Sequence, residues 1–250
     1  METHANHLHK APGKNFGHYF FEFLMLFIAV FCGFLAENYR EHVVEREKEK
    51  QYMHAMIVDL KSDTARITLL ISEDSLNQPR IDSLMHLLRR PDRNNYGQTM
   101  YYFARVITAL GGGRFELADR SYEQMKSSGS LRLINDASVA DSVSAYYSKQ
   151  EDLKQQEQIQ LTRMAYYCNA VTKVFDGAIL QEMLQKHPYE FHVPNGNPAL
   201  LTNDETTINE FIGQLHYYSA ILTINYNLAS EKRANAERLI QLLQSKYHFE

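Results

Sequence analysis

The sequence predicts an all-α protein with one N-terminal transmembrane helix that continues into a long helix and is followed by an antiparallel helical bundle. Three observations predict this class. Residues 19–36 are almost entirely apolar, residues 37–78 contain neither Pro nor Gly, and later segments place apolar residues at helical spacing. A content of 6 Pro and 11 Gly among 250 residues favours helices over an all-β fold.

The apolar stretch at 19–36 is long enough to cross a bilayer. Its 18 residues, at about 1.5 Å each, form roughly 27 Å of helix, close to the hydrocarbon thickness of about 30 Å. Glu22 lies near its start, where a carboxylate reaches the headgroups and avoids the cost of about 2.5–3.5 kcal/mol at the bilayer centre. With flanking aromatic residues, the predicted transmembrane helix covers 16–38. Its anchoring residues are Tyr19, Phe20, Leu24, Phe27, Phe31 and Phe34.

Two other interpretations of this stretch compete with a membrane anchor. A cleaved signal peptide fits poorly, because the apolar region is long and Phe34 occupies a position where a cleavage site needs a small residue. A buried core helix is the simpler alternative. An uncleaved single-pass anchor is the favoured interpretation.

The predicted organisation is a flexible polar tail at 1–15, the transmembrane helix at 16–38 and a helical-bundle soluble domain at 39–250, with a stalk at 39–52. Opposite charges three residues apart support an exposed helix in the stalk. The next segment alternates spacings of four and three between apolar residues, which is typical of a packed bundle or a coiled-coil seam. This possible interaction seam consists of Met53, Ile57, Leu60, Ile67 and Ile71, with Thr64 between them.

Further helices are predicted from start and stop signals. Pro79 favours the start of a second helix, which ends at Pro91. A third helix fits 97–110, before a Gly turn at 111–113 that lacks the context of a phosphate-binding loop. A short helix over 117–125 then ends near Gly129.

Two long helices are predicted in the second half of the chain. One runs from about 137 to 186, is capped by Asn135 or Asp136, and bends at Gly177. The other begins at a capping-box sequence formed by Thr202 and Glu205. Its inward face is predicted to contain Ile208, Phe211, Ile212, Leu215, Leu222, Ala229, Ala236, Leu239 and Leu243.

Adjacent tyrosines recur four times along the predicted helices. Because neighbouring helical residues point about 100° apart, one ring of each pair can pack inward while the other lies at the surface. Amphipathic packing in a bundle is the simpler interpretation, and an aromatic-lined pocket or partner interface is the alternative. The pairs are Tyr101–Tyr102, Tyr146–Tyr147, Tyr166–Tyr167 and Tyr217–Tyr218.

Composition and motifs argue against several classes of function. The net charge of −4 is too mild to indicate a nucleic-acid partner. Cys32 lies in the predicted transmembrane helix and Cys168 in the predicted soluble domain, so no disulfide between them is predicted. No hydrolase, zinc-protease or nucleotide-binding motif occurs, so we predict no catalytic, cofactor-binding or metal-binding residues. The tail histidines His4, His7 and His9 allow a metal site in principle, and so do His187 and His192 with Glu190 between them, but solvated side chains explain both groups better.

The apolar anchor, the exit sequence at 37–63 and the segment SYEQMKSSGSLRLI at 121–134 carry a family likeness. They resemble a bacterial family of single-pass membrane proteins with a helical domain of unknown function. The resemblance implies a short tail, one transmembrane helix and a helical domain. It brings no activity, so no catalytic residue is carried over, and a helix end explains the Lys126–Gly129 stretch equally well.

The predicted function is a membrane-anchored interaction or scaffold module without catalytic activity. The alternative is an extracytoplasmic ligand-sensing domain that acts through a partner protein. The expected partners are the lipid bilayer and either a second copy or another envelope protein. The expected location is the bacterial cytoplasmic membrane, with the C-terminal domain outside, although Arg40 and neighbouring basic residues after the anchor favour the opposite topology.

Overall fold

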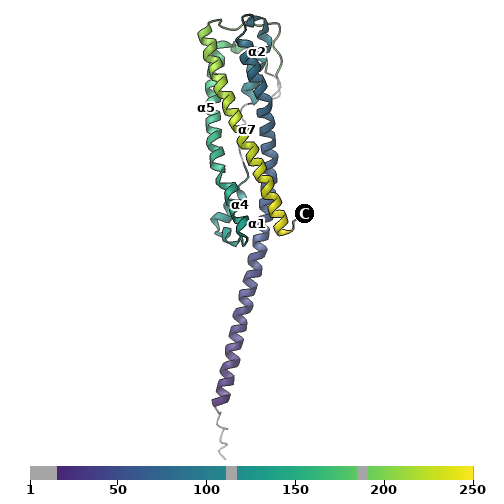
Figure 1. Ribbon diagram of the computed structural model, residues 1–250, viewed down its shortest axis with the longest axis vertical. Helices are drawn as coiled ribbons and strands as arrows, with labels where there is room; N and C mark the ends of the chain where they lie inside the picture. The colour runs from purple at the N-terminus through teal and green to yellow at the C-terminus, as the bar shows by residue number, and fades with distance from the viewer. Residues whose placement is uncertain (1–15, 111–116, 185–190, 250) are drawn as a thin grey trace, which may run out of the picture. The chain divides into compact units, whose positions relative to one another are not determined.

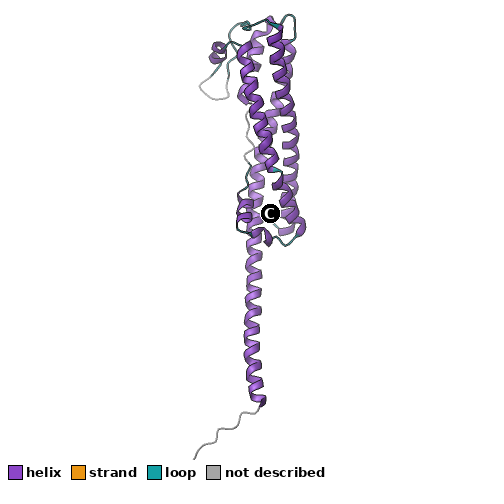
Figure 2. Ribbon diagram, turned by 90° about the vertical axis from the view of Figure 1, so that its left-hand side faces the viewer, coloured by secondary structure: helices purple, strands orange, loops and turns teal. Residues whose placement is uncertain are grey.

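A computed structural model describes residues 16–110, 117–184 and 191–249. Within these ranges the chain is helical and has no strand, apart from an isolated antiparallel bridge between Leu184 and Phe191 (Figure 2). The all-α prediction is therefore confirmed. The elements are α1 (Phe16–Leu88), η1 (Arg93–Tyr96), α2 (Gly97–Leu110), α3 (Arg120–Ser127), η2 (Ser130–Leu133), α4 (Ala137–Ser148), α5 (Gln150–Val174), α6 (Gly177–Glu182) and α7 (Glu205–Tyr247). The predicted tail at 1–15 and the Gly turn at 111–113 lie outside the described residues.

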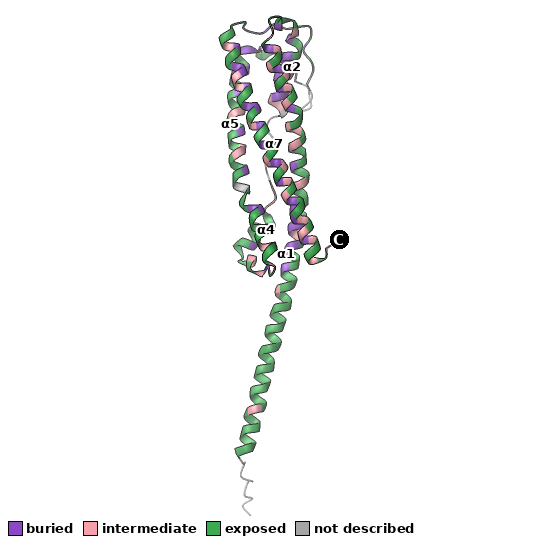
Figure 3. Cartoon of the chain, in the orientation of Figure 1, coloured by how far each residue is buried: buried purple, intermediate pink, exposed green. Residues whose placement is uncertain are grey.

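The chain divides into two compact units, residues 1–50 and 51–250. The described part of the first unit belongs to α1, and nearly all of its side chains are exposed (Figure 3). In the second unit, the remainder of α1 packs with α5 and α7, while α4 continues the line of α5 beside α7 (Figure 1). This unit contains all three apolar clusters of the described residues.

The inward positions of α1 follow one regular pattern. Starting at Met53, spacings of three and four residues alternate as far as Leu88, so that one stripe faces the core. Every side chain in this stripe is buried except Asp74, which is half-buried. The stripe consists of Met53, Met56, Leu60, Asp63, Ile67, Leu70, Asp74, Asn77, Ile81, Leu84 and Leu88.

This stripe explains why the predicted break at Pro79 was wrong. Helix α1 passes through Pro79 and ends at Leu88. A proline inside a helix costs about 3 kcal/mol, because it removes one backbone hydrogen bond and crowds the preceding turn. Pro79 itself is exposed, and the core stripe resumes with fully buried Ile81, Leu84 and Leu88. Burial of these three side chains offsets the cost of the proline.

The single helix predicted over 137–186 was also wrong. Helix α4 ends at Ser148, α5 covers the next stretch to Val174, and a separate short helix, α6, begins at Gly177. Phe175 leaves the helix in an extended conformation, with φ −115° and ψ 137°. Its fully buried ring packs edge-on against Tyr101, and Asp176 then caps α6 by accepting from the amide of Ala178 at 2.8 Å. The end of α5 is thus caused by the packing of Phe175 into the core and not by a local sequence signal.

Helix ends were predicted with mixed success. The bounds of α2 and the cap of α4 by Asp136 are confirmed, and Gly129 follows α3 in the left-handed conformation, at φ 69°. The capping box at the start of α7 was wrong. Asp204 is the cap and accepts from the amide of Thr207 at 2.8 Å, while Glu205 forms an ion pair with Arg93 at 2.6 Å. Asp204 lies directly before the helix and is the better-placed acceptor.

Candidate functional site

The predicted anchoring residues all lie on the first part of α1. Tyr19, Phe20, Phe27, Phe31 and Phe34 are exposed, and Leu24 is half-buried. An 18-residue window of this helix has a mean hydropathy of 2.2, and none of that window is buried. Among the described residues, α1 is the one helix that is long and apolar enough to cross a membrane. An apolar surface of this size needs an apolar environment to cover it.

The predicted interaction seam faces the core of the second unit. Met53, Ile57, Leu60 and Ile67 are buried, whereas Ile71 is half-buried. The first three share a cluster with α4 and with the last turns of α7, including Leu239 and Leu243. The chain's own helices therefore cover this seam, so it is not a free surface for a second protein in this conformation.

A buried carboxylate on the same stripe accepts hydrogen bonds from two other segments. The carboxylate of Asp63 accepts from the hydroxyl of Tyr146 on α4 at 2.8 Å and from the amide of Ala118 at 2.6 Å. Lys232 of α7 is also buried, and its ammonium group donates to the backbone oxygen of Tyr146 and lies 3.4 Å from the centre of that residue's ring. We call Asp63, Tyr146 and Lys232 the Asp63 layer.

Helix α1 also caps α3 through this region. Asp59 accepts from the amide of Ser121 at 3.0 Å, and Asp63 accepts from Ala118 just before the helix. Asp119, the residue at the cap position, makes no side-chain capping bond. Asp59 of another helix thus satisfies a first-turn backbone donor that a local cap usually satisfies, and Asp63 holds the backbone just before the helix.

Burial controls the ionisation of the Asp63 layer. Desolvation raises the pKa of Asp63, although the hydrogen bonds from Ala118 and Tyr146 and the positive charge of Lys232 oppose the shift. Burial lowers the pKa of Lys232 to about 8, against the attraction of Asp63. Burial also raises the pKa of the Tyr146 hydroxyl above its usual range. Burial therefore disfavours the charged forms of Asp63 and Lys232, and their mutual attraction and hydrogen bonds offset part of this desolvation cost.

A second group of buried polar residues interrupts the apolar core, with one residue on each of α1, α5 and α7. Asn77 on α1, Gln160 on α5 and Asn225 on α7 are buried, and the amide of Asn225 donates to Gln160 at 2.7 Å. We call these three residues the Asn225 layer. In sequence they lie between the residues of the cluster around Ile67 and those of the cluster around Tyr218 on each helix.

Asp74 of α1 lies near the Asn225 layer and lines a cavity of about 390 Å³ between α1 and α7. Burial, with repulsion from Glu73, raises the pKa of Asp74 to about 7. The cavity is lined by Asp74, Ser75, Gln78, Pro79, Asp82, Leu222, Thr223 and Tyr226.

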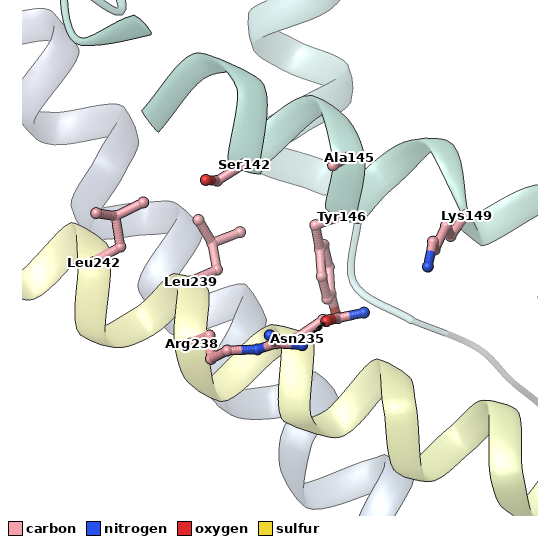
Figure 4. Close-up of a pocket in the computed structure, with 8 residues that line it drawn as sticks. All are labelled: Ser142, Ala145, Tyr146, Lys149, Asn235, Arg238, Leu239 and Leu242. Atoms are coloured by element: carbon pink, nitrogen blue, oxygen red, sulfur yellow. Dashed lines mark hydrogen bonds between the residues drawn. The ribbon is translucent and has the colours of Figure 1, made fainter. Parts of the chain in front are cut away.

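A pocket of about 340 Å³ lies beside the Asp63 layer, between α4 and α7 (Figure 4). Its walls are Ser142, Ala145, Tyr146 and Lys149 on one side and Asn235, Arg238, Leu239 and Leu242 on the other. A smaller cavity of about 110 Å³ adjoins it and shares Lys149 and Asn235. The pocket combines apolar walls with basic and amide groups.

The tyrosine pairs mostly behave as predicted. Tyr101, Tyr167 and Tyr218 are fully buried, while Tyr166 and Tyr217 are exposed. The pair at Tyr146–Tyr147 differs because both rings are buried, and Tyr147 stacks on Tyr122 with ring centres 4.2 Å apart.

The described residues contain no group of three or more His, Cys, Asp or Glu that could hold a metal ion. Of the histidines considered for such a site, His192 is described, whereas His187 and its neighbour Glu190 lie outside the described residues. Cys32 and Cys168 are both free.

The sequence reasoning missed Asp63 and Lys232, although a signal was present. Both occupy inward positions of a three-four pattern, Asp63 between Leu60 and Ile67 and Lys232 between Ala229 and Ala236. The predicted stripe contains Thr64 in place of Asp63, because charged side chains are seldom fully buried. Charged residues at core positions are the signal for a buried polar layer.

No family model matches the chain, and neither a curated protein nor a solved structure matches it. Its class therefore follows from its own geometry. The described residues form an all-α protein, a helical bundle in which one helix is long and apolar enough to span a membrane.

Proposed function

We propose that this protein is a membrane-anchored helical interaction module. The observation that carries the proposal is the exposed apolar segment of α1, whose window has a mean hydropathy of 2.2 and no buried residue. The same helix supplies the first helix of the bundle in the second unit. In this proposal, residues 16–38 lie in the bilayer of a bacterial cytoplasmic membrane and the bundle faces the outside.

Extraction of membranes tests the anchor. The unaltered chain is expected to stay in the membrane fraction after sodium carbonate treatment and to dissolve only in detergent. Placing charges in the segment with Phe27→Lys and Ile28→Lys costs about 2.5–3.5 kcal/mol per residue at the bilayer centre, so this variant is expected in the soluble fraction. Extraction of the unaltered chain by carbonate alone contradicts the proposal. Protease protection of a C-terminal tag then gives the side of the membrane.

The bundle offers one surface that suits a protein partner. Arg163 of α5 lies over the exposed ring of Tyr217 on α7, 5.3 Å from its centre, and 6.0 Å from the centre of Tyr166. Tyr166 and Tyr217 are 51% and 55% exposed, too open for core residues. Tyrosine and arginine dominate the energetically important positions of protein interfaces. We call these three residues the Tyr217 patch and propose it as the contact with a second copy of the chain.

Crosslinking in membranes tests this contact. A photoreactive amino acid at position 217 is expected to join two differently tagged copies of the full chain. The matched control is position 226, because Tyr226 is also exposed and lies nine residues along α7, on the opposite helix face. Equal crosslinking from both positions, or none from 217, overturns the proposed contact without affecting the anchor.

A further inference from the structure

The pocket between α4 and α7 exists because small side chains face large ones. Ser142 and Ala145 on α4 leave space opposite Leu239 and Leu242 on α7 (Figure 4). The resulting volume of about 340 Å³ falls within the usual range for small-molecule sites, roughly 300–1,000 Å³. At about 30 Å³ per water-sized group, the pocket holds about ten non-hydrogen atoms.

The polar part of the wall contains two basic groups, a hydroxyl and an amide, and no carboxylate. Lys149 and Arg238 contribute positive charge, with the Ser142 hydroxyl and the Asn235 amide beside them. Lys149 is already paired with Glu231 at 2.7 Å. Arg238 donates instead to two neutral acceptors, the side-chain oxygen of Asn235 at 2.6 Å and the backbone oxygen of Ala234 at 3.4 Å.

Among the described cations that line the pocket, Arg238 differs from Lys149 in forming no ion pair with a carboxylate. Lys149 is balanced by Glu231, and the buried Lys232 lies in the electrostatic field of Asp63. Among the described residues, Arg238 forms no ion pair, and a guanidinium group has five N–H donors in a planar arrangement that suits a carboxylate. The exposed guanidinium of Arg238 is therefore open to a ligand carboxylate, and Glu231 of the adjoining cavity lies within its electrostatic range without pairing with it.

We propose that this pocket binds a small organic monoanion, a carboxylate joined to an apolar body, with about ten non-hydrogen atoms in total. The carboxylate binds Arg238, and the apolar body lies against Ala145, Leu239 and Leu242. The site belongs to the second unit, so this inference goes beyond the membrane anchor and the Tyr217 patch and depends on neither.

Photolabelling of the full chain in detergent micelles tests the site. The probe is 4-azidobenzoate, and its uncharged counterpart, 4-azidobenzamide, has the same size and shape. We expect 4-azidobenzoate adducts on peptides that contain 142–149 and 235–242, with half-maximal labelling at a concentration about tenfold lower than for the amide. This comparison uses the unaltered chain, so it does not depend on the folding of any variant.

Two variants and one control locate the binding determinants. Arg238→Gln removes the cation and keeps an amide near Asn235, and it is expected to weaken labelling by the carboxylate about tenfold. Ala145→Phe fills the pocket from an exposed position of α4 and is expected to abolish labelling there. Arg132→Gln removes an exposed arginine that does not line the pocket and is expected to change nothing.

The proposal is overturned by any of three results. These are equal labelling by the acid and the amide, adducts spread over other peptides, and Arg238→Gln labelling like the unaltered chain while its helical content is unchanged by circular dichroism.

Discussion

Lys232 stabilises the end of a neighbouring helix from inside the core. Its ammonium group donates to the backbone oxygen of Tyr146, in the last turn of α4, where helix carbonyls lack intrahelical partners and carry partial negative charge. The buried cation thus compensates both this carbonyl and the nearby carboxylate of Asp63.

Replacing Lys232 is therefore expected to destabilise the bundle. Lys232→Met keeps the volume of the side chain but leaves the Tyr146 oxygen without this donor and Asp63 without its nearby cation. We expect the free energy of unfolding to fall by about 2–4 kcal/mol, measured by denaturant titration. Lys154→Met, at an exposed position of α5, is the control and is expected to change it by less than about 0.5 kcal/mol. A similar small change for Lys232→Met contradicts this account.

Asp74 predicts a dependence of stability on pH. Burial raises its pKa from 3.8 to about 7. Between these two pH values the carboxyl group is therefore protonated in the folded chain and ionised in the unfolded chain. The free energy of unfolding therefore decreases as pH rises from about 4 to about 7, because the buried carboxylate becomes charged.

The variant Asp74→Asn removes this dependence. At pH 8 it is expected to raise the free energy of unfolding by about 1–2 kcal/mol relative to the unaltered chain, because an amide avoids the cost of a buried charge. At pH 4 the two chains are expected to be nearly equal. Asp82→Asn, at an exposed position of the same cavity, is the control. Denaturant unfolding at both pH values measures the difference in the free energy of unfolding between the two chains. An equal difference at pH 4 and pH 8 contradicts the prediction.

At the scale of single elements, two glycines at helical positions predict opposite results for the same substitution. A Cβ on Gly97, at the start of α2, lies 1.9 Å from the backbone oxygen of Pro198, so backbone must move. A Cβ on Gly213, inside α7, meets nothing within 4 Å.

Gly97→Ala is expected to lower the free energy of unfolding by about 2 kcal/mol or more, because the clash forces the loop at Pro198 away from α2. Gly213→Ala is expected to raise it by about 0.5–1 kcal/mol, because alanine is the better helix former. Thermal unfolding of both variants checks the sign. A shift in the same direction for both contradicts the close packing of α2 on this loop.

Sequence patterns were reliable for elements whose local signals agree with the packing. The bounds of α2 and the cap at Asp136 were predictable from short-range signals. The continuation through Pro79 was not, because it depends on burial of Ile81, Leu84 and Leu88 against residues far along the chain. The interruption at Phe175 likewise depends on Tyr101, about seventy-five residues earlier. Similarly, one-dimensional patterns place charges on the surface, so the Asp63 layer and the pocket beside Arg238 emerge only from the fold.

At the scale of the whole molecule, the second unit carries the complete core. Its three apolar clusters draw only on residues from 51 onward. The shortened chain 51–250 is therefore expected to fold, remain in solution without detergent and unfold cooperatively. Circular dichroism and size-exclusion chromatography check this, and loss of helical signal in the shortened chain contradicts it.

The two polar layers also have a consequence for how the long helices are aligned. The apolar positions of α1 and α7 recur at spacings of three and four residues, so sliding one helix past the other by a heptad still brings mostly apolar positions face to face. The buried polar side chains differ in chemistry from one heptad to the next, because Asn225 lies one heptad before Lys232 on α7. Such a slip carries Lys232 away from Asp63 and Asn225 away from Gln160, so each buried polar group loses the partner that compensates its burial. The polar layers thus fix the register of the helices and disfavour bundles with a shifted register, at some cost in stability.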